Sequence, residues 1–169
     1  MENQTTTPEP TTGKVQYAGF WWRFLAYIID ELIISVIETI LVIPFMVVFG
    51  ISFASMADSG QDLEDMLPAA LPLFGAMFIL IIISIALNWL YFAIMESSKQ
   101  QGTVGKMVLK IKVTDMNGKQ ISFGRATGRF FGKIVSGLIL MIGYIMAGFT
   151  EKKQALHDMM AGCLVIKEN

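Results

Sequence analysis

The stretch GFWWRFLAYIIDELIISVIETILVIPF, residues 19–45, decides the class of the fold. It is a nearly continuous apolar run whose only charged side chains are Arg23, Asp30, Glu31 and Glu38. The run is longer than the roughly 17–25 residues that a helix needs to cross a bilayer. It therefore predicts a membrane helix, and its charged side chains are candidate functional residues because charges are costly at membrane depth.

The composition of the whole chain indicates an integral membrane protein. Of its 169 residues, 54% are hydrophobic and 16% are charged, whereas soluble domains carry about 25% charged residues. A single cysteine, Cys163, excludes an internal disulfide. Residues 1–16 are rich in Thr, Pro and Glu and predict a disordered tail, which leaves residues 17–169 as one membrane domain.

Three apolar segments predict an all-α fold. They cover residues 20 to 57, 67 to 95 and 130 to 149. The first is too long for one upright span, so either it tilts or its aromatic start lies in the membrane interface, and Pro44 is expected to kink it. The third either spans the membrane or is re-entrant, with a break near Gly143.

The charges between the segments predict the orientation. The loop after the first segment is acidic, and residues 97–133 are strongly basic, with Asp115 as the only acidic residue. The positive-inside rule places this basic loop, and with it the N-terminus, in the cytoplasm. A spanning third segment would send the C-terminus outside, and a re-entrant one would return it to the cytoplasmic side.

The basic loop has a pattern of its own. Apolar and polar residues alternate from Leu109 to Thr114, and Asn117-Gly118 follows, which predicts a small β-hairpin. Basic residues at a spacing of four then predict an amphipathic helix leading into the third segment. We expect contacts with anionic lipid headgroups from Lys106, Lys110, Lys112, Arg125, Arg129 and Lys133.

The charges of the first segment share one helical face. Arg23, Asp30 and Glu38 fall within about 80° at 100° per residue, with Glu31 beside them. Arg23 and Asp30 are close enough to lean together or to share a third partner. The face is either an ion or proton path or a structural ionic cluster. Glu38 is the deepest: its carboxyl either holds a proton or pairs with Asn88 or with a basic group of another helix.

Other chemistry finds little support in the sequence. His157, Asp158 and Cys163 do not make a metal site without further ligands. The sequence GTVGK at 102–106 lacks the Ser or Thr that a phosphate-binding loop needs at the next position, which is Met107. We expect no cofactor, no enzymatic activity and no nucleic-acid partner.

Three motifs taken together resemble the RDD family of small, mostly bacterial multi-pass membrane proteins, which implies a bacterial cell membrane as the location. They are FWWRFLAYIID, SSKQQGTVGKMVLKIKVTDMNGKQISFGRATGRF and QALHDMMAG, and the resemblance covers about residues 18 to 166. It implies that the named residues of the family are Arg23, Asp30 and Asp158. Its loop pattern is matched by Gly102, Gly105, Lys106, Gly118 and Arg129. Cys163 stands where other members more often have threonine.

The resemblance leaves two functions open. Transport has been proposed for the family, including cation/proton exchange in some members, which implies a polar path through Arg23, Asp30 and Asp158. The alternative is a membrane scaffold or accessory subunit whose charges hold helices together. In both cases three segments enclose little space, so we expect a homo-oligomer or a partner membrane protein. If the three residues act together, Asp158 must approach the cytoplasmic end of the first segment, as a re-entrant third segment would allow.

Overall fold

The structure is a computed structural model that describes residues 15–60, 62–139 and 141–168. Most of the predicted disordered tail, residues 1–14, lies outside the described residues. The part that is described joins the fold: the carbonyl of Gln16 accepts a hydrogen bond from the N–H of Lys167 at 2.8 Å. The N–H of Ala18 donates to the carbonyl of Val165 at 2.8 Å. The N-terminal segment therefore lies along the C-terminal strand.

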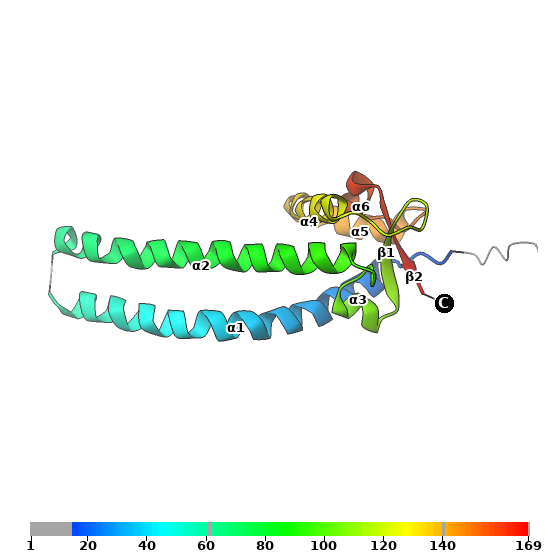
Figure 1. The fold of residues 1–169 in the computed structure, drawn as a ribbon. Coiled ribbons are helices and arrows are strands. Elements are labelled where there is room, and N and C mark those ends of the chain that lie inside the picture. The colour runs from blue at the N-terminus through cyan, green and yellow to red at the C-terminus, as the bar shows by residue number, and fades with distance from the viewer. Residues whose placement is uncertain (1–14, 61, 140, 169) are drawn as a thin grey trace, which may run out of the picture.

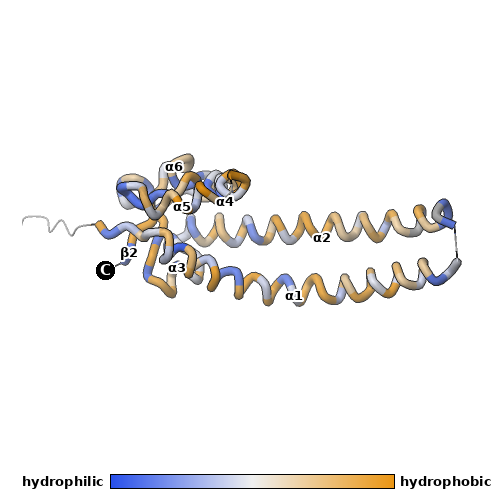
Figure 2. Tube along the Cα trace, turned by 180° about the vertical axis from the view of Figure 1, so that it is seen from behind, coloured by the Kyte–Doolittle hydropathy of each residue, from blue (hydrophilic) through white to orange (hydrophobic). Residues whose placement is uncertain are grey.

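Two long antiparallel helices form the shaft of the molecule (Figure 1). α1 covers Phe20–Asp58 and α2 covers Leu63–Ser97. Both are long and apolar enough to cross a membrane, and only 6% of the apolar window of each is buried within the chain. Figure 2 shows apolar residues along both helices. α1 continues through Pro44 without interruption and, at 1.5 Å per residue, is about 58 Å long.

The third apolar segment is broken into two helices. α4 covers Phe123–Leu138, α5 covers Ile142–Phe149, and the two are bent by 103°. Met141 has the left-handed φ of 61° at the break. Behind it α5 packs tightly on α4, because a Cβ at Gly143 would lie 2.7 Å from the Cβ of Ser136. The break lies close to the predicted one, and α4 is seen almost along its axis where α1 and α2 are seen from the side (Figures 1 and 2).

The prediction of a β-hairpin is wrong, because its first strand pairs with a different strand. β1, Ile111–Asp115, pairs antiparallel with β2, Cys163–Lys167, with Val113 opposite Val165. The Asn117-Gly118 turn does form, with a φ of 78° at Gly118 and a hydrogen bond of 2.8 Å from the N–H of Asp115 to the carbonyl of Lys119. No second strand follows the turn because Ser122 already caps α4.

The pairing of β1 with β2 brings the C-terminus back to the end of the shaft from which the loop starts (Figure 1). Residues 98–139 and 141–168 form a lobe there, which also contains two short helices, α3 at Val104–Val108 and α6 at Leu156–Ala161. Its core is made of small and β-branched residues, namely Ile111, Val113, Ile121, Ala126, Cys163 and Val165. The third segment therefore does not carry the chain to the far end of the shaft.

The contact between α3 and α1 depends on a glycine. A Cβ at Gly105 would lie 2.1 Å from the carbonyl oxygen of Ala26. We expect Gly105→Ala to lower the melting temperature in detergent sharply, because a backbone carbonyl cannot move aside as a flexible side chain can. Gly128→Ala is the matched control: nothing lies within 4 Å of its Cβ position, and alanine in a helix is favoured over glycine by about 0.5–1 kcal/mol. Equal effects of the two changes would contradict this packing.

Candidate functional site

The carboxylate of Asp158 joins three helices. It lies at the start of α6 and is fully buried. Arg23 of α1 donates to it through Nη1, Arg129 of α4 through Nε at 2.7 Å, and the N–H of Ala155 at 3.0 Å. Burial alone would raise the pKa of Asp158, but the charges of Arg129 and Arg23 outweigh it and hold the pKa well below its usual range. Asp158 is therefore an anion at neutral pH.

A second buried carboxylate extends the network to α2. Glu96 accepts from Arg129 Nη1 at 2.6 Å and from Lys106 Nζ, and Lys133 Nζ lies 3.8 Å away. We call Arg23, Glu96, Lys106, Arg129, Lys133 and Asp158 the ion cluster. Arg129 is its central residue, since it contacts both carboxylates. In the described part of the chain, every buried side-chain nitrogen and oxygen has a hydrogen-bond partner.

Asp30 lies in a separate polar contact. Its carboxylate accepts from Thr103 Oγ1 at 2.5 Å, from the N–H of Gly105 at 2.7 Å and from Tyr91 Oη at 2.8 Å. All three donors are neutral. Among the described residues Asp30 and Arg23 share neither a hydrogen bond nor an ion pair, so the expected leaning together does not occur. Asp30 instead holds the start of α3 against α1, and Arg23 finds its carboxylate in Asp158.

The other polar residues of the first segment lie farther along α1. Asn88 Nδ2 of α2 donates to Glu38 Oε1 at 3.0 Å, which is one of the pairings expected for Glu38. Glu31 is exposed on the surface of α1. Neither Glu31 nor Glu38 contacts the ion cluster, so the polar residues predicted from the sequence separate into a buried set at the lobe and a pair within the shaft.

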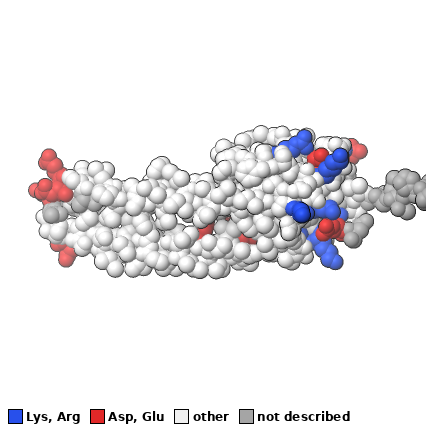
Figure 3. Space-filling model, viewed as in Figure 1, with Lys and Arg blue, Asp and Glu red and all other residues white. Residues whose placement is uncertain are grey.

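Burial divides the six basic residues for which we expected lipid contacts. Lys106 and Arg129 are buried in the ion cluster, so their burial does not agree with headgroup contact. Lys110 and Arg125 are exposed, and Lys112 pairs with Glu168 at 3.3 Å. Lys133 is partly buried, with its Nζ 3.9 Å from the centre of the Phe92 ring. Figure 3 shows basic groups at the lobe end and acidic groups at the opposite end.

Sequence reasoning missed Glu96, Tyr91 and Thr103. Glu96 is the charged residue that ends a long apolar helix directly before a basic loop, and that position is a signal for an ion pair with the loop. Tyr91 is one aromatic residue among several in the second apolar segment, and its hydroxyl carries no signal of a partner in the sequence. Thr103 directly precedes α3, a common position for threonine, so nothing in the sequence indicates its hydrogen bond to Asp30.

His157 belongs to the packing of the lobe. Its Nδ1 lies 3.2 Å from Ser136 Oγ and its Nε2 lies 3.6 Å from Asp158 Oδ1. Burial is the main cause that lowers the pKa of His157 to about 3, so the ring is neutral. The order Ser136, His157, Asp158 resembles the catalytic triad of a hydrolase. However, Ser136 is fully buried, and its hydroxyl donates a hydrogen bond to the carbonyl of Gly132 at 2.9 Å. No substrate can reach this hydroxyl in the described structure.

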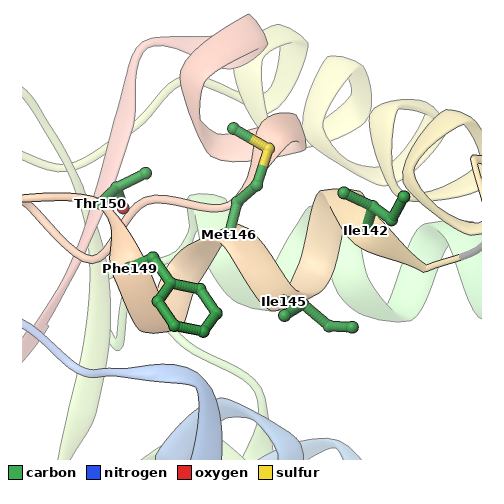
Figure 4. Close-up of a pocket in the computed structure, with 5 residues that line it drawn as sticks. All are labelled: Ile142, Ile145, Met146, Phe149 and Thr150. Atoms are coloured by element: carbon green, nitrogen blue, oxygen red, sulfur yellow. The ribbon is translucent and has the colours of Figure 1, made fainter.

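The surface of α5 is apolar. An open groove is lined by Ile142, Ile145, Met146, Phe149 and Thr150, and in Figure 4 Ile145 and Phe149 point towards α1 while Met146 points towards α6. The described residues contain no group of three His, Cys, Asp or Glu side chains placed to hold a metal. The ion cluster is therefore the candidate site, and its chemistry is that of paired charges.

Comparison with known proteins agrees with this arrangement. The RDD family profile matches residues 17–162, from the start of α1 to the end of α6. The chain belongs to the RDD family. Arg23, Asp30 and Asp158, which the resemblance implies as the named residues of the family, tie α1 to α3 and α6.

Two proteins of Bacillus subtilis are similar to this chain over most of their length. The uncharacterized protein YxaI of Bacillus subtilis (strain 168) is 40% identical over 88% of this chain and 96% of its own. The uncharacterized membrane protein YteJ of the same organism is 30% identical over 90% of this chain and 82% of its own. No solved structure matches this RDD protein significantly.

The ion cluster makes a prediction about stability. Asp158→Asn should lower the free energy of unfolding by about 3–5 kcal/mol, because in a buried site it leaves Arg23 without its carboxylate and Arg129 with Glu96 alone. Glu168→Gln, which removes a carboxylate that is 53% exposed, should change it by less than about 0.5 kcal/mol. Thermal unfolding of both variants in detergent measures the difference.

Thermal unfolding also measures the coupling between Arg23 and Asp158. Arg23→Gln with Asp158→Asn should cost less than the sum of the two single changes, since the double variant removes one charge of each sign. Additive losses would show that Arg23 and Asp158 are not coupled.

Proposed function

We propose that this RDD protein is a membrane scaffold or accessory subunit, in which the ion cluster locks the lobe onto a two-helix membrane anchor. One observation carries the proposal: the cluster's two carboxylates, Glu96 and Asp158, are buried and each is bound by two or more cations. A transport site must exchange partners during its cycle, whereas buried pairs of this kind are costly to open. The geometry favours a fixed joint.

The position of the cluster in the bilayer supports the same proposal. α2 has no charged residue between Asp65 and Glu96, a stretch of about 45 Å at 1.5 Å per residue. The hydrocarbon core is only about 30 Å thick, so Glu96 and the cluster around it lie at headgroup level. Charges there are tolerated with little cost, and Tyr91 lies near the boundary of the hydrocarbon, where aromatic residues are enriched.

The charged residues do not continue along the shaft beyond Glu38. No charged residue occurs in α1 between Glu38 and Asp58. Phe45, Phe49 and Phe53 stack along it, with ring centroids 6.2 Å apart, and Phe49 packs on Phe74 of α2 at 5.9 Å. One chain therefore supplies charged groups in only half of the membrane thickness.

Cation or proton movement is the second candidate, and the Glu38–Asn88 hydrogen bond favours it. A carboxyl inside a membrane helix is a functional residue by default, and this one lies deeper than the ion cluster. Several copies or a partner would have to complete the far half of such a path.

Ion-dependent proton flux in proteoliposomes separates the two candidates. A scaffold predicts that folded wild-type protein gives no more flux than empty liposomes. Flux that Glu38→Gln abolishes would contradict the scaffold and favour the transport path. Asp30→Asn serves as a second variant, since it removes the charge at the family's named position and leaves Glu38 intact.

We further propose that the lobe end faces the cytoplasm of the cell and rests on anionic headgroups. The exposed basic residues that support this are Lys99, Lys110, Lys119, Arg125 and Lys152, and the opposite end carries Asp58, Asp62, Glu64 and Asp65. This distribution fits the positive-inside rule. Each basic residue near an anionic surface contributes on the order of 1 kcal/mol.

Thiol labelling tests the orientation. In a Cys163→Ala background, Lys167→Cys and Asp62→Cys should react with an impermeant maleimide from opposite sides of sealed vesicles. Since β2 pairs with β1, a cysteine at Lys110 should label from the same side as one at Lys167. Labelling of Lys167→Cys and Asp62→Cys from one side would refute the topology.

A further inference from the structure

We propose that the seam between α1 and α2 at Glu38 and Asn88 is a homodimer contact, where a second copy of the chain supplies the hydrogen-bond partners that one copy lacks. The inference deepens the proposed function, because it names the partner with which the scaffold assembles. It rests on the depth of the pair, on its unused polar atoms and on the face of α1 on which it lies.

The pair lies inside the hydrocarbon. The midpoint of the uncharged stretch of α2 is near Ile81, so Asn88 is about 11 Å from the membrane centre at 1.5 Å per residue. This is within the roughly 15 Å half-thickness of the hydrocarbon. Glu38 lies at the same depth, since it is 3.0 Å from Asn88 Nδ2.

Each member of the pair has polar atoms without a protein partner. Over residues 15–60, 62–139 and 141–168, the only side-chain hydrogen bond of either residue is the one between them. Glu38 Oε2, Asn88 Oδ1 and the second Nδ2 hydrogen of Asn88 are left. Both side chains are partly exposed, and at this depth they meet lipid and not water. An unsatisfied polar group there costs several kcal/mol.

The unused atoms are complementary to those of a second copy. Copies inserted in the same orientation have Glu38 and Asn88 at equal depth, and a two-fold axis along the membrane normal brings identical surfaces together. Asn88 of one copy can then donate to Glu38 Oε2 of the other. A carboxyl in its protonated form can donate in return to Asn88 Oδ1. Lipid chains offer neither partner.

Further polar residues precede Glu38 on the same face of α1. At 100° per residue, Tyr27, Glu31 and Ser35 lie within an arc of about 80° that includes Glu38, and all three are exposed. The opposite face carries Val36, Ile40 and Val47, which are 60%, 69% and 54% exposed. Figure 3 shows acidic atoms on the otherwise uncharged shaft. Lipid suits the apolar face, and a protein neighbour suits the polar one.

Directed cross-linking tests the contact. In a Cys163→Ala background, Ser35→Cys lies on the polar face and Val36→Cys on the opposite face. With the full chain in lipid vesicles and a short bis-maleimide, we expect Ser35→Cys to give at least five times more dimer than Val36→Cys. Equal dimer at both positions, or none at either, would overturn the proposal, and so would an adduct that is not twice the chain mass.

Substitutions of Glu38 provide the second measurement. Adding Glu38→Leu to Ser35→Cys should remove most of the dimer, whereas Glu38→Gln, which keeps a donor and an acceptor, should retain it. Unchanged circular dichroism verifies that both variants fold, since Glu38 lies outside the ion cluster. Dimer yield that is unaffected by Glu38→Leu would refute the role of this residue. Proton flux tests the proposed scaffold function, and cross-linking tests the homodimer contact. Each proposal can therefore be refuted independently of the other.

Discussion

The pairing of Asp158 with Arg23 and Arg129 is the interaction on which the rest of the structure depends. Helices in a membrane have no hydrophobic force that drives them together, because lipid chains are as apolar as leucine. The first and last helices of this chain must therefore be joined by polar contacts. A carboxylate shared by two guanidinium groups does so at one point, and it closes the lobe against α1.

This joint explains the bend of the third apolar segment. Asp158 can reach Arg23 only if the chain returns to the end of the shaft at which α1 begins. The 103° angle between α4 and α5 makes that return possible, and the pairing of β2 with β1 continues it. The exposed apolar surface of α4 and α5, including Leu138 and Phe149 at 79% and 86% exposure, suits a segment that dips into the membrane from one side.

The polar residues of the two long helices have different roles because they lie at different depths. In the membrane placement that we propose, Asp30 and Glu96 lie near the headgroups, where the loop and the lobe can supply donors. Glu38 lies about two helical turns deeper than Asp30, beyond the reach of the lobe, and only Asn88 is near it within the chain. The first two stabilise the fold of one copy, whereas the third is free to act between copies.

The sequence by itself determined the class of the fold, the two long apolar helices and the identity of Arg23, Asp30 and Asp158 as candidate residues, and it left open whether the third segment is one span or is broken. Hydropathy and charge suffice for these because they are properties of local segments. Only the tertiary structure decided which charged residues pair with each other. Arg23 pairs with a residue 135 positions away, and β1 pairs with the C-terminal strand and not with its neighbour. Lys106 and Arg129 turn inward because buried Glu96 and Asp158 require counter-charges, a demand that no local pattern contains.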